Sequence, residues 1–194
     1  MIIVTGATGS VGSELVRLLS DGGSRVRALS RDPERGEGLP GVEWVQADLA
    51  RRSELPEAFE GGDRLFLLTG NGEDMVWLQK NAIEAAERAG IGHVVKLSAL
   101  GATDHSKSVI GLWHYNVERI VEDSDLLWTF LRPHHFMQNL LDPRVYDREE
   151  GRVYSASGDG RIPFIDARDI AEVARTVLVE EDHHGRTYTL TGPE

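Results

Sequence analysis

A glycine-rich turn near the start of the chain carries the clearest chemistry in the sequence. Thr5-Gly6-Ala7-Thr8-Gly9-Ser10-Val11-Gly12 follows a short apolar run and opens a segment with helical spacing. Glycines in such a turn permit a tight bend, let the backbone approach a pyrophosphate and allow close helix–strand packing. The N-terminus of the helix then offers free N–H groups to the phosphates. The motif predicts a dinucleotide site rather than a purely structural turn, and a P-loop is disfavoured because no Gly-Lys-Ser/Thr follows.

The residues after the second expected strand bear on which dinucleotide binds. The strand Arg25–Leu29 runs into Ser30-Arg31-Asp32-Pro33. In sites that prefer NAD, an acidic residue at this point binds the ribose hydroxyls. Here Arg31 can instead clamp a 2′-phosphate and stack on adenine, with Arg35 as a weaker second cation. The sequence therefore favours NADPH, with NADH as the alternative; the competing interpretation of Arg31 is an ordinary solvated loop arginine.

The elements that position these residues alternate along the chain. Short apolar runs rich in β-branched residues are separated by segments with helical spacing, such as Val11–Leu19 and Met75–Ala89, the second followed by Gly90 as a C-cap. Near-continuous apolar strands between helices predict a parallel sheet covered on both faces, an α/β doubly wound Rossmann fold. The expected strands are Ile2–Thr5, Arg25–Leu29, Val42–Gln46, Arg64–Leu68, Val94–Leu97 and Thr129–Leu131.

The chain is expected to form a single domain, 1–194, with residues 1–133 as the dinucleotide-binding core. The pattern loosens after Pro133, so residues 134–194 are expected to form a lid on the substrate side, over the carboxyl edge of the sheet. The elements expected in this region are a short strand at Arg152–Ser155, a helix at Asp166–Val179 capped by Asp166 or Asp169, and a strand at Thr187–Leu190.

Composition narrows the function classes. The 194 residues carry 32 acidic and 21 basic side chains, a formal charge of −11, and no cysteine. Without cysteine there is no thiol catalysis, iron–sulfur cluster or cysteine zinc site. The negative balance disfavours nucleic acid and anionic membranes as partners. The apolar start is too short for a signal peptide or a membrane span, which predicts a soluble cytoplasmic protein.

Two pairs of adjacent histidines raise the question of a metal. They are His134-His135 and His183-His184. Adjacent side chains in an extended segment are expected to point apart, and no carboxylate cluster with ligand spacing lies nearby in the sequence. The sequence therefore predicts no metal site.

Further motifs follow the glycine turn in a fixed order and extend to about Thr191. Each is of medium specificity, but their order and spacing together are informative. They are Ala47-Asp48-Leu49, Lys96-Leu97-Ser98-Ala99-Leu100-Gly101, Trp128-Thr129-Phe130-Leu131-Arg132-Pro133, Phe136-Met137-Gln138-Asn139 and Phe164-Ile165-Asp166-Ala167-Arg168-Asp169-Ile170-Ala171.

On these motifs the chain resembles the short-chain dehydrogenase/reductase superfamily, and within it the atypical, NmrA-like branch. That branch includes NADPH-dependent quinone and azo-compound reductases and also redox-sensing regulators. The resemblance implies that Asp48 and Leu49 contact adenine and that Ser98 lies near the nicotinamide. It also implies that the segment Thr69, Gly70 and Asn71 runs along the ribose and pyrophosphate. The plainer alternatives are a helix cap for Asp48 and a simple strand end for Ser98.

The superfamily's usual Tyr-x-x-x-Lys pair has only a near-match here, Tyr115-Asn116-Val117-Glu118-Arg119. Counting back from the Trp-Thr-Phe-Leu-Arg-Pro motif places the family's lysine position at His114 and its tyrosine position at Ile110. Tyr115 would then point elsewhere on the helix, about 100° from His114. We therefore expect His114 to supply a proton or a hydrogen bond to the acceptor, against the alternative of a packed helix histidine.

The residues after the sixth strand complete the predicted site. Pro133, Phe136 and Met137 would line the place of a flat, apolar acceptor. The leading hypothesis is an NADPH-dependent reductase of quinone-like or other conjugated small molecules; the rival is an NADP(H)-binding sensor without turnover. A sugar-nucleotide epimerase is disfavoured because those enzymes also use the tyrosine. Relatives usually continue beyond the position of Glu194, so a fragment and a short form with an open pocket both stay open, as does a homodimer.

Overall fold

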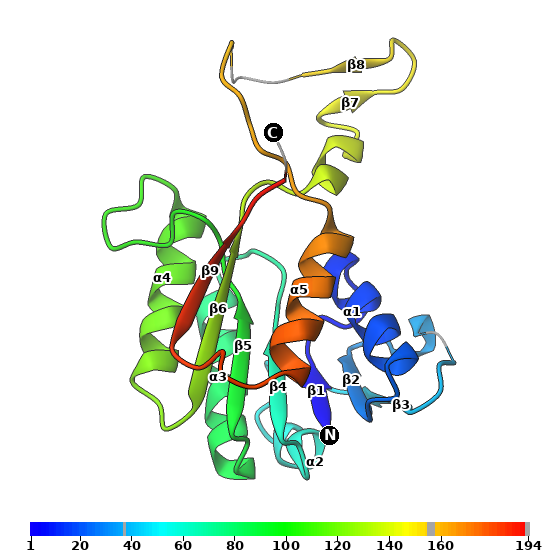
Figure 1. Cartoon of the computed structure of the whole chain (residues 1–194), viewed down its shortest axis with the longest axis vertical. Coiled ribbons are helices and arrows are strands. Elements are labelled where there is room, and N and C mark those ends of the chain that lie inside the picture. The colour runs from blue at the N-terminus through cyan, green and yellow to red at the C-terminus, as the bar shows by residue number, and fades with distance from the viewer. Residues whose placement is uncertain (37, 155–157, 193–194) are drawn as a thin grey trace.

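A seven-stranded parallel sheet forms the centre of the molecule in a computed structural model that describes residues 1–36, 38–154 and 158–192 (Figure 1). The strand order is β3-β2-β1-β4-β5-β6-β9, and every neighbouring pair is parallel. This order confirms the predicted doubly wound α/β fold. The strands are β1 (Ile2–Val4), β2 (Val26–Ser30), β3 (Val42–Gln46), β4 (Arg64–Leu67), β5 (His93–Leu97), β6 (Leu127–Pro133) and β9 (Arg186–Leu190).

Helices cover both faces of the sheet. On one face α1 (Ser10–Asp21) and α5 (Ala167–Val179) pack against each other and against β1, β2, β4 and β5. On the other lie α2 (Leu55–Phe59), α3 (Met75–Ala89) and α4 (Val109–Glu122). The inner strands β1, β4 and β5 contribute side chains to both apolar layers, which explains why they are nearly continuous apolar runs. Among the described residues no helix is long and apolar enough to cross a membrane.

Local signals set the helix boundaries. Helix α3 ends at Gly90, whose φ of 72° lies in the left-handed region, as expected for a C-cap. Helix α5 begins after Asp166, whose side chain accepts a hydrogen bond from the Arg168 N–H, so Asp166 rather than Asp169 is the cap. In the seven-stranded sheet, observed strand ends differ from the predicted ones by at most one residue, except for β6, which begins two residues earlier and ends two residues later than expected.

The last third of the chain divides between the sheet and a projecting segment. Strand β9 pairs with β6, and α5 packs on α1, so both belong to the layers of the sheet. Residues 134–154 and 158–165 instead project above the carboxyl edge, with a 3-10 turn at Met137–Leu141 and a small hairpin of β7 (Tyr146–Asp147) and β8 (Arg152–Val153) (Figure 1). The part that projects is therefore shorter than the lid expected over 134–194, and its role as a lid stays a prediction. Ser155, placed in the expected short strand, lies outside the described residues.

Candidate nucleotide and acceptor site

The glycine-rich turn connects β1 to the start of α1. Gly6 has a φ of 63°, and a Cβ there would lie 2.9 Å from the Leu68 carbonyl oxygen. A Cβ on Gly12 would lie 2.1 Å from the Gly6 carbonyl oxygen, so α1 can approach the turn this closely only with glycine. Gly9 is the N-cap and has no side chain to occupy the first N–H groups of α1. The turn therefore has the shape and the donors of a pyrophosphate cradle.

Side chains around this turn divide between core and surface. Ala7 and Val11 are buried in the core, whereas Thr8 is half-buried and Gly9 and Ser10 are exposed. Thr5 holds the turn against the end of the neighbouring strand β4, because its hydroxyl donates to the Leu68 carbonyl and accepts from the Leu68 N–H, both at 2.8 Å. The motif thus presents mainly backbone to a ligand.

A hollow of about 220 Å³ lies where β2 and β3 end. Arg31 and Asp48 both line it, as the sequence predicts for the adenosine end of a dinucleotide, but Arg35 does not. The second cation of the hollow is Arg51, which sequence reasoning missed because it stands in an ordinary polar loop. Asp48 Oδ1 accepts from the Ala50 N–H at 3.0 Å, so Asp48 stabilises a local turn and does not cap α2.

A glutamine beneath the end of β4 positions the next loop. Gln79, on α3 and 1% exposed, donates from Nε2 to the Thr69 hydroxyl at 2.8 Å. Thr69 is half-buried while Gly70 and Asn71 are exposed at the same edge. Leu49 is half-buried, and its carbonyl accepts from Asn81 of α3. A polar residue within an apolar helical stripe was the available signal for both Gln79 and Asn81.

The end of β5 is held by a buried carboxylate. Ser98 donates from Oγ to Glu118 Oε1 at 2.6 Å, and Glu118 on α4 is fully buried. Arg132 at the end of β6 binds the same carboxylate, with Nε 2.9 Å from Oε1 and Nη2 2.5 Å from Oε2. This contact raises the pKa of Arg132. Ser98 therefore lies at the predicted edge, but its hydroxyl hydrogen is directed inward.

His114 forms a second buried pair beside this carboxylate. Its Nδ1 lies 2.9 Å from Nζ of Lys96, a β5 residue with no exposed surface. Burial, together with the Lys96 charge, lowers the pKa of His114 to about 3. At neutral pH His114 is therefore an uncharged ring that can take part in hydrogen bonds, but it does not hold an ionisable proton for transfer.

The tyrosine near-match lies on another face of α4. Arg119 stands over the Tyr115 ring, with 5.4 Å from its Cζ to the ring centroid. The two therefore contact each other, whereas His114 faces β5. The expected difference in direction between His114 and Tyr115 is present in the structure.

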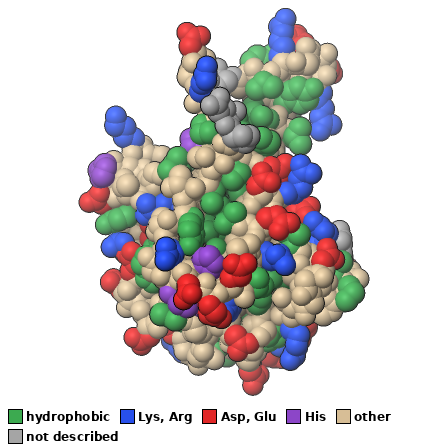
Figure 2. All heavy atoms as spheres, in the orientation of Figure 1, with side chains coloured by type: hydrophobic (Ala, Val, Ile, Leu, Met, Phe, Trp, Pro, Cys, Tyr) green, Lys and Arg blue, Asp and Glu red, His purple; other side chains and the backbone are tan. Residues whose placement is uncertain are grey.

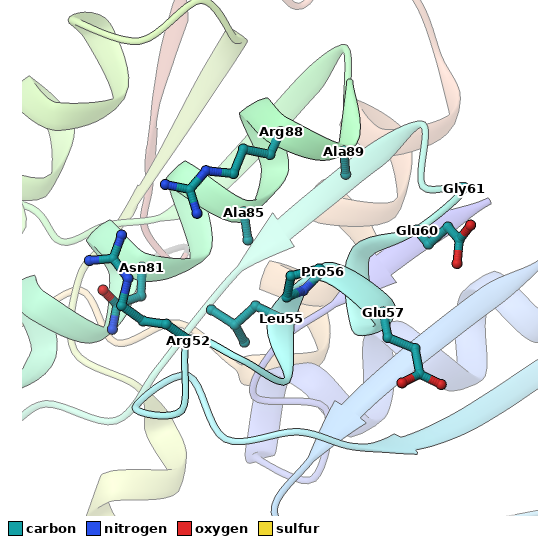
Figure 3. A pocket seen from close by; sticks show the side chains of 10 residues that line it. All are labelled: Arg52, Leu55, Pro56, Glu57, Glu60, Gly61, Asn81, Ala85, Arg88 and Ala89. Atoms are coloured by element: carbon teal, nitrogen blue, oxygen red, sulfur yellow. The ribbon is translucent and has the colours of Figure 1, made fainter.

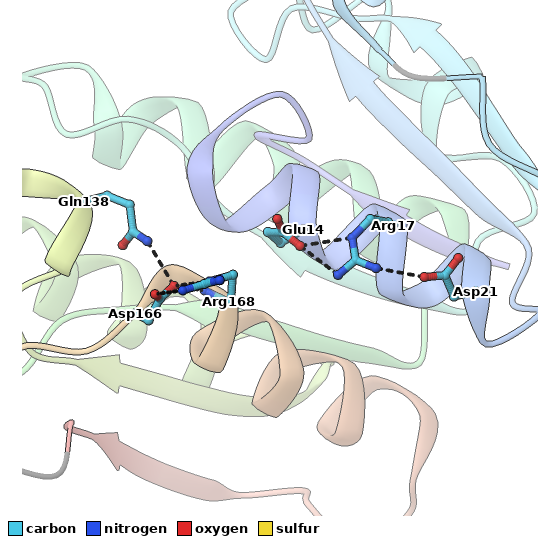
Figure 4. Close-up of polar contacts among 6 residues, drawn as sticks. All are labelled: Glu14, Arg17, Asp21, Gln138, Asp166 and Arg168. Atoms are coloured by element: carbon cyan, nitrogen blue, oxygen red, sulfur yellow. Dashed lines mark hydrogen bonds and ion pairs between the residues drawn. The ribbon is translucent and has the colours of Figure 1, made fainter. Parts of the chain in front are cut away.

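The segment after β6 is anchored to the start of α5 (Figure 4). Gln138 donates to Asp166 Oδ1 at 2.9 Å and accepts from the Ala167 N–H at 3.0 Å. Arg168 forms an ion pair with Asp166 and, as the largest cause, lowers the pKa of that carboxyl. This anchoring gives the neighbouring Phe136 and Met137 a fixed base.

The predicted acceptor residues differ in exposure. Pro133 is buried at the end of β6, Phe136 is half-buried against the core, and Met137 is 41% exposed. Further exposed apolar side chains follow along the projecting segment. Figure 2 shows hydrophobic side chains on this upper projection, where the exposed ones are Met137, Leu141, Val153 and Tyr154.

A larger hollow, about 550 Å³, lies between α2 and α3 (Figure 3). Gly61 and Ala89, two of the residues that line it, precede β4 and β5, so this hollow reaches toward the amino ends of the strands. Arg52 and Arg88 at its rim both form ion pairs with Glu84. It contains none of the predicted site residues.

The two histidine pairs differ from each other in whether the neighbouring rings point apart. Nδ1 of His134 and Nδ1 of His135 lie 3.3 Å from each other, so that expectation is wrong for the first pair. In the second pair, His183 bonds Tyr188 while His184 packs edge-on against His93. Among the described residues, no group of three potential metal ligands is present.

Comparison with known proteins agrees with this geometry. Residues 6–181 match the family model described as NAD(P)H-binding. The chain belongs to that family. Its similarity to the relatives below places it in the NmrA-like branch of the atypical short-chain dehydrogenases/reductases.

Several of the relatives are reductases. The chain is 39% identical to an NAD(P)H azoreductase of Xenophilus azovorans over its whole length and 68% of that protein. It is 31% identical to quinone oxidoreductase 2 of Escherichia coli, over 99% of this chain and 68% of that protein. The structure of that Escherichia coli enzyme with NADPH superimposes with a TM-score of 0.88, over 99% of this chain and 69% of that one. A triphenylmethane reductase of Citrobacter gives 0.88 at 27% identity, over 100% of this chain and 70% of that one. The family thus includes azo, quinone and dye reductases.

Proposed function

We propose that this protein is an NADPH-dependent reductase of quinone-like or other conjugated small molecules. The observation that carries the proposal is the sharing of one sheet edge by a pyrophosphate cradle, an arginine-lined hollow and an apolar segment. The named relatives include azo and quinone reductases, which supports a conjugated acceptor.

Different residues along that edge would bind different parts of the cofactor and the acceptor. The N–H groups at the start of α1 would hold the pyrophosphate, and Arg31 with Arg51 would hold the 2′-phosphate. The bound cofactor supplies the hydride. Met137 and Phe136 would hold the flat acceptor and exclude water, while His114 is the candidate hydrogen-bond donor. A conjugated acceptor gives a stabilised anion that water can protonate, so the site has no need of the Tyr-x-x-x-Lys pair.

Steady-state oxidation of NADPH, with NADH in parallel, against a panel of quinones and azo dyes tests the proposal. We expect turnover that prefers NADPH. No turnover, with NADPH binding verified by fluorescence in the same samples, would favour the alternative of an NADP(H)-binding sensor that signals without reduction. Turnover that prefers NADH would overturn the assignment of Arg31 and Arg51 as phosphate ligands.

A further inference from the structure

The pair formed by Lys96 and His114 is unusual because a lysine lies fully buried inside an apolar strand. Lys96 has no exposed surface, and its Nζ donates to the Leu97 carbonyl at 3.0 Å. Its second contact is His114 Nδ1, at 2.9 Å. Burying an amine in the core costs free energy, so packing alone does not account for a lysine at this position.

The hydrogen-bond inventory of the pair fixes which nitrogen of His114 carries hydrogen. A charged Lys96 is an ammonium group with three donors and no acceptor, so in that state Nδ1 of His114 must accept from it. A neutral imidazole that accepts at Nδ1 carries its hydrogen on Nε2. Within residues 1–36, 38–154 and 158–192, Nε2 has no hydrogen-bond partner, and the His114 ring is 7% exposed.

Burial, together with the Lys96 charge, keeps the ring neutral. Glu118, one turn along α4, is the nearest carboxylate, but it already binds Arg132 and Ser98. Burial, opposed by Glu118 and aided by Arg132, lowers the pKa of Lys96 to about 7. Below that pH the amine is mainly charged, and its charge opposes a second cation on His114.

We propose that Lys96 is a positioning residue that fixes the Nε2–H tautomer of His114, so that a neutral ring donates a hydrogen bond to the acceptor. The donation rests on the proposed reductase function; the tautomer does not. Such a donor would stabilise negative charge that develops on an acceptor oxygen or nitrogen after hydride transfer. Final protonation is then left to water.

NMR on protein labelled with nitrogen isotopes in its histidines tests the tautomer directly, at pH 6, where the lysine is charged. We expect wild-type His114 to be neutral and protonated on Nε2 alone. Lys96→Met removes the donor while keeping an unbranched chain, and should give a mixture of tautomers. The exposed Lys107 provides the matched control, Lys107→Met, which should leave the His114 signals unchanged. An Nδ1–H tautomer in the wild type would overturn the proposal even if Lys96→Met does not fold.

Kinetics test the donation. We expect Lys96→Met to lower kcat about tenfold while the KM for NADPH stays within about twofold, because the lost interaction concerns the acceptor. Unchanged kcat in Lys96→Met, with the mixed tautomer seen by NMR, would overturn the donation and leave the reductase intact. Absence of turnover in the wild type would instead contradict the proposed function, while the tautomer would still stand on the NMR result.

Discussion

The two halves of the sheet bury different kinds of polar side chain. Around β1, β2 and β3 the buried polar residues are small hydroxyls, Thr5, Ser20 and Ser30. The other half buries ionisable side chains, and all four of those in the described part of the chain lie on β5 or α4. They are His93, Lys96, His114 and Glu118.

This contrast separates two ways of building a site. The half proposed to bind the nucleotide has a shape set by backbone: Gly6 and Gly12 let α1 come close, and N–H groups would bind the phosphates. The half proposed to bind the acceptor has side chains that other buried side chains orient, as Glu118 does for Ser98. The geometry of a site made of backbone depends on steric fit, whereas that of a buried polar network depends on every member having its hydrogen-bond partners.

The strongest test of the backbone half is Gly12→Ala. The new Cβ would lie 2.1 Å from the Gly6 carbonyl oxygen, which is backbone and cannot turn aside. We expect NADPH affinity to fall about 100-fold or more, because the turn and α1 must separate. Isothermal titration with NADPH measures it.

A glycine in open space provides the control. Among the described residues beyond its chain neighbours, a Cβ on Gly38 would meet no atom within 4 Å, so Gly38→Ala should bind NADPH as the wild type does. Equal affinity of Gly12→Ala and wild type would show that close approach of α1 is not what makes the cradle.

For the side-chain half the corresponding change is Glu118→Gln. It removes the charge that Arg132 and Ser98 share, and Arg132 is only 27% exposed on its side chain. We expect the free energy of unfolding to fall by about 3 kcal/mol, because a partly buried guanidinium loses its counter-ion. Urea unfolding at neutral pH measures the loss.

The matched control is a solvent-facing pair on α1 (Figure 4). Glu14 accepts from Arg17, and Arg17 also binds Asp21 at the helix surface. Glu14→Gln should leave the free energy of unfolding within experimental error, since exposed ion pairs contribute little. If Glu118→Gln and Glu14→Gln lower the free energy of unfolding by the same amount, burial is not what distinguishes the two ion pairs.

A smaller effect is expected at the outer end of the nucleotide half. Arg31→Asp places a carboxylate in the hollow where the 2′-phosphate would lie, so we expect NADPH to bind about 10- to 100-fold more weakly and NADH within about threefold. Arg35→Asp, outside the hollow, should discriminate far less. If Arg31→Asp weakens the binding of NADPH and NADH equally, Arg31 does not bind the 2′-phosphate.

The sequence predicts the two halves unequally. Strand positions and the glycine turn follow from local periodicity and steric demand, and both were predicted closely. The pairing of β9 with β6 was not, because it joins segments more than 50 residues apart by backbone contacts that leave no local pattern. Lys96 was missed as a buried group because lysine is seldom buried. Two features of the sequence could have indicated this buried group. One is the place of the lysine within an apolar strand, and the other is the spacing of His114 and Glu118, four residues apart on one face of a helix.

The smallest expected effect concerns His93, at the amino end of β5 and far from the ligand edge. The Thr129 hydroxyl donates to the His183 carbonyl, so it accepts from His93 Nε2–H, and the buried Nδ1 has no partner among the described residues. Burial, with His184 and Arg64 nearby, lowers the pKa of His93 to about 4.

Because the unfolded chain binds this proton near pH 6.5 and the folded chain only near 4, stability is lost as pH falls between those values. We expect His93 to remove about 2 kcal/mol from the free energy of unfolding between pH 7 and pH 5. His93→Gln keeps an N–H for Thr129 but does not titrate, so the stability that this variant loses over this range should be smaller by that amount. His114, Lys96 and His134, whose pKa values are also lowered, contribute to the slope that remains. The exposed His105 gives the control for the substitution itself, because His105→Gln should leave the free energy of unfolding at neutral pH close to the wild-type value. A wild-type slope in His93→Gln would mean that the buried histidine is protonated in the fold, and that the ionisable half of the sheet tolerates charge as the surface does.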